Sequence, residues 1–288
     1  MMMTKQTRQL AAIITGQNTT DGASVKLKRV VSQQQKNVFD PFILLDEFGS
    51  DEPTDYVGGF PDHPHRGFET VTYMLEGAML HRDHLGNEGH LRAGDVQWMT
   101  AAHGIIHSEM PEQKDGLLHG FQLWINLPAK EKMKPPHYQE FSADKIPHID
   151  LAGGGYLRVI AGEYTNETEK IIGPVTGVST QPLYFDVLLS SQQHLEITVS
   201  LEHTVLVYIY KGELAIDESN KTLKAGQLGQ LVNGHNLQLT TKEQSARFLV
   251  LAGLPLKEPV VQAGPFVMNT IEEIEQAFSD YRNGMLTL

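Results

Sequence analysis

Two short stretches of the chain each carry a pair of potential metal ligands separated by one residue. The first pair is His63 and His65, and the second pair is His107 and Glu109. Successive side chains of an extended strand point to opposite faces, so the two members of each pair project from the same face. If the two strands lie side by side in a barrel wall, three imidazoles and one carboxylate converge. That donor set suits a divalent first-row metal and leaves octahedral positions open for water, dioxygen or a chelating substrate.

The segment between the two pairs predicts the strands that would position them. From Glu69 the chain continues as TVTYMLEG, passes a polar hairpin, resumes as LRAGDVQWM at Leu91 and turns tightly at Gly104. This order of ligand pair, strand, glycine turn, strand, glycine turn and second ligand pair is similar to the layout of a cupin barrel. A single histidine in a strand more often packs or hydrogen-bonds than binds metal, and the chain holds 13 histidines. The combined pattern nevertheless favours a metal site over that simpler interpretation.

Further polar residues lie in the hairpin between these strands. His81, Asp83, His84 and His90 flank the turn sequence GNEG. Because an exposed hairpin tip rarely holds ligands in a fixed geometry, we expect most of these side chains to lie in water and not to form a second metal site.

Two other segments are expected to border the metal site. The glycine-bearing loop at residues 56–62 is a candidate lid, and its Phe60 is a candidate pocket wall. Residues 117–127 alternate as a barrel strand that places Gln122 and Trp124 on one face. For this strand the favoured role is core packing.

The second half of the chain repeats the strand and turn pattern of the first half without its ligands. The segment YIYKG ending at Gly212 corresponds to YMLEG ending at Gly77, and the turn at Gly234 corresponds to the turn at Gly104. At the four ligand positions this half has two hydroxyl residues and two leucines, which cannot hold a divalent metal against water: Thr198, Ser200, Leu237 and Leu239.

These patterns predict an all-β fold of two tandem cupin, jelly-roll-like β-barrels followed by a C-terminal helix. The charged, proline-bearing segment at residues 128–136 is the expected linker. We expect a metal-binding cupin domain at residues 1–141. A degenerate, metal-free cupin domain that includes the terminal helix is expected at residues 142–288.

The helix is predicted at residues 270–284. Thr270 is a suitable N-cap, two glutamates follow it in the first turn, and Gly284 can end the helix. Apolar residues that recur at helical spacing are expected to pack on a barrel: Ile271, Ile274, Phe278 and Tyr281.

Composition narrows the classes of function. The chain has 288 residues, 40% hydrophobic and 20% charged, which is typical of a globular protein with a full core. A formal net charge of -12 without a basic cluster argues against direct nucleic-acid binding. The absence of cysteine excludes disulfides and thiolate ligands. No segment has the pattern of a signal peptide or a membrane span, so we expect a cytoplasmic protein that does not enter a membrane.

Five blocks of sequence resemble the signature blocks of the pirin family, a branch of the cupin superfamily. They are DPFILLDEF at 40–48, FPDHPHRGFETV at 60–71, GDVQWMTA at 94–101, HSEMP at 107–111 and GPFVMNT at 264–270. The blocks are long and extend through almost the whole chain. One departure is His103, which stands where the family pattern has arginine.

The resemblance implies a chemistry for the site. Some family members resemble quercetin 2,3-dioxygenases, which open the central ring of a flavonol with O2 and release carbon monoxide. The expected cofactor is one divalent transition metal, iron(II) first, with manganese, nickel, copper, cobalt or zinc as alternatives. A flavonol 3-hydroxyl and its neighbouring carbonyl form a bidentate chelate, and coordination lowers the pKa of that hydroxyl. Glu109 is the expected proton acceptor, and it could serve as ligand, base or both in turn.

Two other functions remain open at this level. Eukaryotic nuclear members of the family act as iron-dependent transcriptional co-regulators, so the metal could instead stabilise or switch a surface that contacts another protein. The acidic balance and the degenerate second barrel favour this alternative slightly. An isomerase or lyase that acts on a different chelating substrate is a third hypothesis, because cupin metal sites host many reactions.

Overall fold

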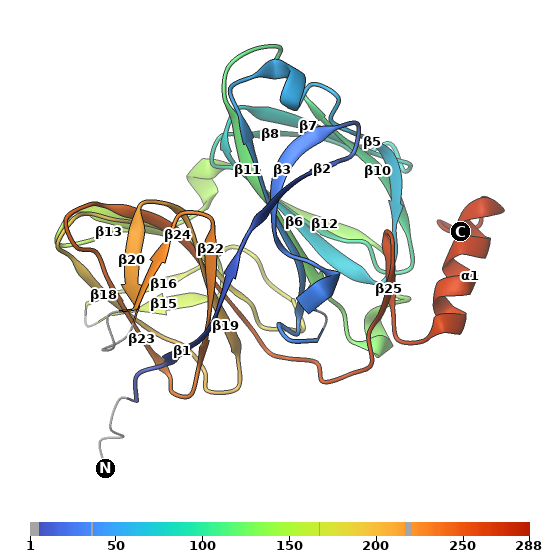
Figure 1. Cartoon of the computed structure of the whole chain (residues 1–288). Coiled ribbons are helices and arrows are strands. Elements are labelled where there is room, and N and C mark those ends of the chain that lie inside the picture. The colour runs from blue at the N-terminus through green and yellow to red at the C-terminus, as the bar shows by residue number, and fades with distance from the viewer. Residues whose placement is uncertain (1–5, 36, 167, 217–220) are drawn as a thin grey trace. The chain divides into compact units, whose positions relative to one another are not determined.

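The computed structural model describes residues 6–35, 37–166, 168–216 and 221–288 (Figure 1). The chain divides into two compact units. One, here called the ligand unit, comprises Gln17–Asp144 and Leu256–Leu288. The other, here called the second unit, comprises Lys145–Pro255 and the described residues up to Gly16.

The ligand unit contains two antiparallel sheets. A seven-stranded sheet has the order β12-β9-β6-β11-β4-β3-β2, and a four-stranded sheet has the order β5-β10-β7-β8. The strands are Gln17–Asp21 (β2), Val25–Val31 (β3), Phe42–Ser50 (β4), Phe60–His65 (β5), Phe68–Glu76 (β6), Ala78–Asp83 (β7), Glu88–Arg92 (β8), Val96–Thr100 (β9), Ile105–Pro111 (β10), Leu118–Asn126 (β11) and His137–Phe141 (β12). Short 3-10 helices occupy Gln33–Gln35, Pro53–Asp55 and Ala129–Glu131, and a two-stranded ladder pairs Val261–Ala263 (β25) with Phe266–Met268 (β26).

The second unit repeats this arrangement. Its seven-stranded sheet has the order β1-β22-β19-β24-β17-β14-β13, and its four-stranded sheet has the order β18-β23-β20-β21. The strands are Gln9–Thr15 (β1), His148–Asp150 (β13), Gly155–Ala161 (β14), Glu163–Thr165 (β15), Lys170–Ile172 (β16), Leu183–Leu189 (β17), His194–Thr198 (β18), Thr204–Lys211 (β19), Glu213–Ile216 (β20), Lys221–Lys224 (β21), Gln227–Val232 (β22), Asn236–Thr240 (β23) and Ala246–Gly253 (β24). A 3-10 turn at Ala143–Lys145 joins the two units along the chain. The prediction of an all-β fold with two tandem jelly-roll-like units is confirmed.

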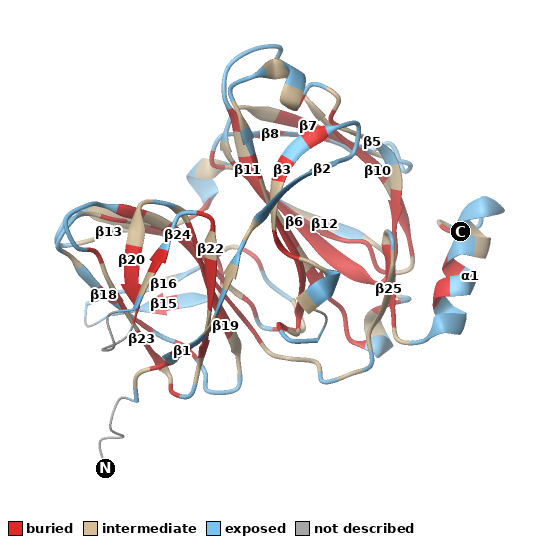
Figure 2. Ribbon diagram, in the orientation of Figure 1, coloured by how far each residue is buried: buried red, intermediate tan, exposed pale blue. Residues whose placement is uncertain are grey.

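The residue pattern explains which strands lie at the centre of a sheet and which lie at its edge. The central strands β19 and β24 read TVLVYIYK and ARFLVLAG and are buried along most of their length (Figure 2). The edge strands β8 and β18 instead alternate strictly between exposed and buried residues. Alternation arises because one face of an edge strand packs on the core while the other meets water.

The interiors of the two units are filled differently. In the second unit one continuous apolar cluster packs between the sheets, and it includes Leu237 and Leu239 at the positions of His107 and Glu109. In the ligand unit a cavity is lined by residues of two apolar clusters, Phe48 and Met79 from one and Ile43 with the adjoining Trp124 from the other. That the second unit binds no metal stays a prediction.

The division into units corrects the predicted domains at the two ends of the chain. Strand β1 pairs with β22 in the second unit, although the residues before Gln17 were predicted to belong with the first domain. The C-terminal helix α1 (Ile271–Arg282) packs beside β25 and β26 in the ligand unit, although it was predicted to belong with the second domain. The internal boundary falls at Asp144, close to the predicted one. A single linear boundary cannot represent chain ends that pair with distant strands.

Helix α1 begins as predicted, and most of its predicted packing stripe contacts β26. The Thr270 side chain accepts a hydrogen bond from the Glu273 backbone, and the Glu273 carboxylate accepts one from the Thr270 backbone, which is a capping box. The buried residues are Ile274 and Ala277. Of the other residues in the predicted packing stripe, Ile271 is 61% exposed, whereas Phe278 and Tyr281 are 36% and 40% exposed and place their rings edge-on against Phe266 of β26. None of the helices among the described residues is both long and apolar enough to span a membrane.

Candidate metal centre

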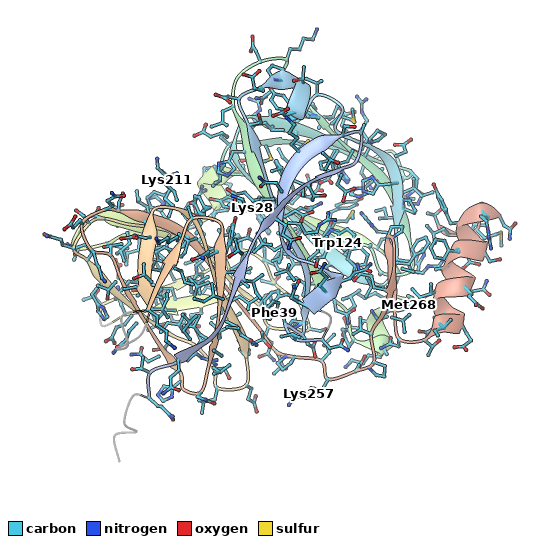
Figure 3. All side chains as sticks on the ribbon, in the orientation of Figure 1. Lys28, Phe39, Trp124, Lys211, Lys257 and Met268 are labelled. Carbon is cyan, nitrogen blue, oxygen red and sulfur yellow. The ribbon has the colours of Figure 1, made fainter. Side chains whose placement is uncertain are left out.

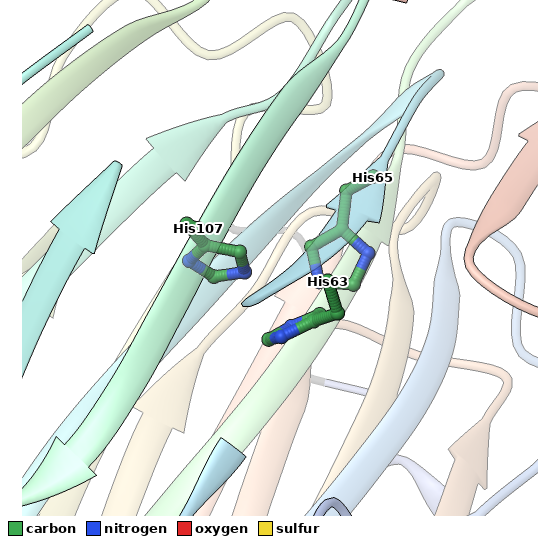
Figure 4. Close-up of side chains that lie close together, drawn as sticks. All are labelled: His63, His65 and His107. Atoms are coloured by element: carbon green, nitrogen blue, oxygen red, sulfur yellow. The ribbon is translucent and has the colours of Figure 1, made fainter. Parts of the chain in front are cut away.

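Strands β5 and β10 are antiparallel neighbours, and they carry the two predicted ligand pairs. His107 lies opposite His63, and Ile105 lies opposite His65. The register shifts between His107 and Glu109, where a β-bulge interrupts the alternation. The rings of His63, His65 and His107 lie together at this point (Figure 4).

The three histidines form a compact cluster. Ring centroids are 4.3 Å apart for His63 and His107, 4.7 Å for His63 and His65, and 4.9 Å for His65 and His107. One ring nitrogen from each residue lies within 4.8 Å of the other two. Three imidazole nitrogens this close together form a suitable donor set for one divalent first-row ion.

Hydrogen bonds determine which ring nitrogens remain available. His63 Nδ1 lies 2.8 Å from the carbonyl oxygen of Pro61. A carbonyl oxygen can only accept, so Nδ1 carries the proton and Nε2 keeps its lone pair. His65 Nδ1 and His107 Nε2 are buried without a hydrogen-bond partner among the described residues. Buried polar atoms normally have partners, so these two nitrogens fit a site in which a metal ion is the missing partner.

Burial keeps two of the three imidazoles neutral. Desolvation lowers the pKa of His65 and of His107 well below the ordinary value, and the neighbouring His63 lowers both further. A metal binds the neutral form of imidazole, because the ligand nitrogen must hold a free lone pair. Near neutral pH both buried rings are therefore ready to bind without first losing a proton.

Glu109 is buried in the wall of the same cavity, but it does not belong to the cluster that the three histidines form among the described residues. Thr72 Oγ1 donates to its Oε1 at 2.7 Å, and Gln122 Nε2 donates to its Oε2 at 3.1 Å. These two donors fix the orientation of the carboxylate in the cavity wall. Its predicted roles as fourth ligand and as proton acceptor stay predictions.

A cavity of about 710 Å³ opens beside the histidines. Pockets of roughly 300–1,000 Å³ are typical of small-molecule sites. His63, His65 and Glu109 contribute to its wall. Apolar and aromatic side chains make up much of the remainder, including Leu27, Phe48, Phe60, Met79 and Trp124, the last labelled in Figure 3. The prediction that Phe60 forms a pocket wall is confirmed, while the lid role of its loop stays a prediction.

An ion pair borders the cavity on one side. Arg29 binds Asp46 in a bidentate manner, with contacts of 2.9 Å and 2.6 Å, and it also reaches Asp21 at 2.7 Å. Burial raises the pKa of Asp46 to about 6, although the bond to Arg29 opposes the shift. Because one guanidinium faces two carboxylates, this side of the cavity has no excess positive charge that could attract an anionic ligand.

The structure corrects the prediction for one histidine of the hairpin. Strand β7 runs as far as Asp83, so His81 lies inside the strand and not at the exposed tip. His81 is only 1% exposed, whereas His84 and His90 are exposed as predicted. The register of the sheet is the signal that could have found it, because His81 lies directly opposite Glu109 on β10.

Strand β11 contributes two cavity residues that were assigned to core packing. Gln122 and Trp124 share a face, as the alternation predicts, but that face lines the cavity. The Trp124 ring meets the His65 ring edge-on at 5.1 Å. The sequence pattern identified the shared face of the two residues but could not show that a cavity lies on it.

Residues near the C-terminus contact the chain directly after strand β5, which carries His63 and His65. Arg66, next to His65, donates to the backbone carbonyls of His103 and Leu286 and pairs with Asp280 at 2.6 Å. His103 therefore contributes its backbone to this contact, and its side chain is not among the described residues that line the cavity. The departure from arginine at this position leaves the contact intact.

Comparison with known families identifies the chain. A family profile named Pirin matches residues 24–125, and a profile named Pirin C-terminal cupin domain matches residues 184–287. The chain belongs to the pirin family. The predicted family and the predicted cupin architecture of the second half are both confirmed.

Pirin relatives match over nearly the full chain. A Pseudomonas aeruginosa protein named "Putative quercetin 2,3-dioxygenase" is 50% identical over 282 residues, which covers 98% of this chain and 99% of that protein. The Homo sapiens protein named pirin is 38% identical over 280 residues, covering 96% of this chain and 93% of the human protein.

Solved structures of the family share the fold. A crystal structure of quercetin 2,3-dioxygenase from Acinetobacter baumannii aligns with a TM-score of 0.90 at 35% identity, covering 98% of this chain and 99% of that one. A bacterial pirin from Escherichia coli, solved in complex with nickel(II), aligns with a TM-score of 0.64 at 20% identity, covering 85% of this chain and 98% of that one.

Proposed function

We propose that this chain is a metal-dependent dioxygenase that opens quercetin or similar flavonols with O2. The observation that carries the proposal is the cluster of three histidines beside a largely apolar cavity, two of them with a buried ring nitrogen that has no partner within the described part of the chain. The names of the Pseudomonas relative and of the Acinetobacter structure support the same reaction class.

His63, His65 and His107 would hold the metal, with iron(II) as the first choice. A bound divalent metal supplies Lewis acidity and open coordination positions for a chelating substrate and O2. The histidines contribute three neutral donors from two adjacent strands, so both strands keep the ligands in place while the substrate exchanges.

Glu109 is the proposed acceptor of the substrate hydroxyl proton. The hydrogen bonds from Thr72 and Gln122 hold its carboxylate in one orientation at the cavity wall. A base held in a fixed orientation beside its substrate is what general base catalysis requires. Glu109 could also enter the coordination sphere as a fourth ligand.

The cavity wall suits a neutral aromatic substrate. Phe60 and Trp124 offer flat apolar surfaces against which aromatic rings can pack. The Arg29 guanidinium is already engaged by Asp46 and Asp21, so it is not available to bind a carboxylate or sulfate on the substrate.

The proposal is tested by oxygen uptake with quercetin, using protein stripped of metal and reloaded separately with iron, manganese, nickel, copper, cobalt or zinc. We expect uptake with at least one metal, and we expect His65→Ala to abolish it because one of three imidazole donors is lost. The exposed His84 provides a matched control, since His84→Ala should retain uptake.

The opposite result has a defined meaning. If every sample binds one metal ion per protein chain and none consumes oxygen, the dioxygenase proposal is wrong. The same metal centre would then be better assigned to binding, and the search should turn to a protein partner whose affinity changes with the state of the metal.

A further inference from the structure

His81 contacts the Nδ1 side of the ring of His107, one of the three proposed ligands. Its Nε2 is 2.8 Å from Nδ1 of His107, and the two ring centroids are 4.9 Å apart. Both residues are 1% exposed, so water does not compete for this hydrogen bond. The other ring nitrogen of His107, Nε2, is buried and has no partner among the described residues.

The chemistry of imidazole links the two nitrogens of His107. A neutral imidazole has one N–H and one lone pair, so a ring that presents its Nε2 lone pair must carry the proton on Nδ1. Among the described residues, Nε2 of His81 is the atom that lies within hydrogen-bond distance of His107 Nδ1. His81 must therefore accept, and its own proton must lie on Nδ1.

Neighbouring elements leave His81 little freedom to turn away. The Tyr138 ring from β12 meets the His81 ring edge-on at 5.2 Å. Glu109 lies opposite His81 on β10, and Asp83 is two residues further along β7 on the same face. Packing therefore holds the His81 ring in place as the acceptor. Residues that hydrogen-bond to metal ligands are generally fixed in this way.

We propose that His81 is the positioning residue of the metal centre: it accepts the Nδ1 proton of His107 and thereby directs the Nε2 lone pair of His107 toward the metal. The inference rests on the proposed metal centre, but it does not depend on dioxygenase activity. His81 itself is not a ligand in this arrangement.

The first test measures metal affinity by competition with a chelator, with nickel(II) as the probe. His81→Phe keeps a ring of similar size and removes the acceptor, and we expect it to weaken nickel binding roughly 10- to 100-fold. His81→Gln restores an acceptor oxygen at a similar reach, so it should recover most of the affinity. The control is His84→Ala, which changes an exposed histidine of the same hairpin. It should bind nickel as tightly as the unaltered protein does.

The second test needs no variant and so does not depend on how the variants fold. Nitrogen-15 NMR of the zinc-loaded protein, by two-bond proton correlations in the imidazole rings, reports which ring nitrogen carries each proton. We expect His107 and His81 both to carry the proton on Nδ1.

Four outcomes would overturn the inference, the last of them together with the proposed metal centre. Equal nickel affinity in His81→Phe and the unaltered protein would show that the acceptor is not needed. Equal weakening in His81→Phe and His81→Gln, with unchanged thermal unfolding of the metal-free proteins, would show that some property other than acceptance matters. A proton on Nε2 of His81 in the zinc-loaded protein would contradict the mechanism directly. If the unaltered protein binds no metal at all, the proposed metal centre fails, and this inference fails with it.

Discussion

At the scale of single residues, the partner of the second ring nitrogen separates the histidines of this chain by role. The Nδ1–H of His63 donates a hydrogen bond to the Pro61 carbonyl, which leaves the Nε2 lone pair available. His107 presents its Nε2 because its Nδ1 faces another histidine. By contrast, His90 and His119 lie 2.8 Å and 2.9 Å from glutamate oxygens in ordinary side-chain pairs away from the cluster. Residue type alone therefore does not identify a ligand.

Glu109 gives a prediction at this scale. Glu109→Gln keeps the size of the side chain and removes its ability to take a proton, so kcat with quercetin should fall by roughly 10²- to 10⁴-fold, the usual contribution of a general base. Bound metal should persist, because three histidines still hold it. Kinetics and metal analysis of the same sample measure both quantities.

Glu112→Gln is the matched control, since this carboxylate lies on the surface and pairs with His90. It should leave kcat unchanged. If Glu109→Gln loses metal in parallel with activity, the residue acts as a ligand and not only as a base.

At the scale of elements, the ligand strand β5 depends on a segment from the far end of the chain. Gly67 follows the first ligand pair and has a φ of +92°, and a Cβ there would lie 2.0 Å from the Val267 carbonyl oxygen. Arg66 makes its ion pair with Asp280 in α1 at the same place. Helix α1 and β26 thus form a close-fitting support for the turn that carries His65.

This fit predicts an unequal response to two chemically identical substitutions. Gly67 and Gly116 have similar φ values of +92° and +82°, but nothing lies within 4 Å of a Cβ at Gly116. Both alanine variants are destabilised by the left-handed backbone conformation. Only in Gly67→Ala does the new Cβ also clash with the Val267 backbone. Gly67→Ala should therefore lower the free energy of unfolding by about 1–3 kcal/mol more than Gly116→Ala does, which is the usual cost of overpacking.

Urea denaturation of the two variants measures the difference. Nickel affinity should fall with Gly67→Ala and stay unchanged with Gly116→Ala, because only the first change displaces the turn next to His65. Equal stability losses in the two variants would mean that the C-terminal segment yields easily and does not hold the ligand strand.

At the scale of the whole ligand unit, Lys132 joins three segments that are distant in sequence. Its buried Nζ lies 2.6 Å from the Gly67 carbonyl oxygen, 2.6 Å from the Asn126 side-chain oxygen and 2.9 Å from the Val267 carbonyl oxygen. Burial lowers the pKa of Lys132 from 10.5 to about 7. The residue therefore couples the folding of the unit to pH.

The sign of this coupling follows from proton binding. Between pH 7 and pH 10.5 the unfolded chain holds a proton on Lys132 that the folded chain has largely released. Stability from this group therefore rises with pH across that window, and below it the cost of burying the charge is fully present. The unfolding free energy of the unaltered protein, minus that of Lys132→Met, should increase from about pH 7 to about pH 9.5.

Lys130→Met is the control, because Lys130 is exposed and makes no bond to these segments among the described contacts. Lys130→Met removes the same charge from the chain and leaves the contacts of Lys132 with Gly67, Asn126 and Val267 in place. If the difference in unfolding free energy between the unaltered protein and Lys132→Met does not change with pH, Lys132 stays charged throughout the window in the folded protein.

The features of this protein that depend on local pattern could be predicted from its residues alone. Alternation along strands identified the histidine pairs, the repeated glycine turns identified two similar units, and Thr270 identified the start of the helix. Family blocks then indicated the pirin family. These features are readable because side-chain direction repeats every two residues in a strand and every 3.6 in a helix.

The surroundings of each strand face could not be predicted in this way, because they depend on how distant strands pair. The β-bulge after His107, the burial of His81 and the cavity beside Gln122 and Trp124 all depend on strands that are far apart in sequence. The same is true of the chain ends, which pack in the opposite units from those predicted. Periodicity gives the direction in which a side chain points, but only the pairing of distant segments determines the atoms that it meets there.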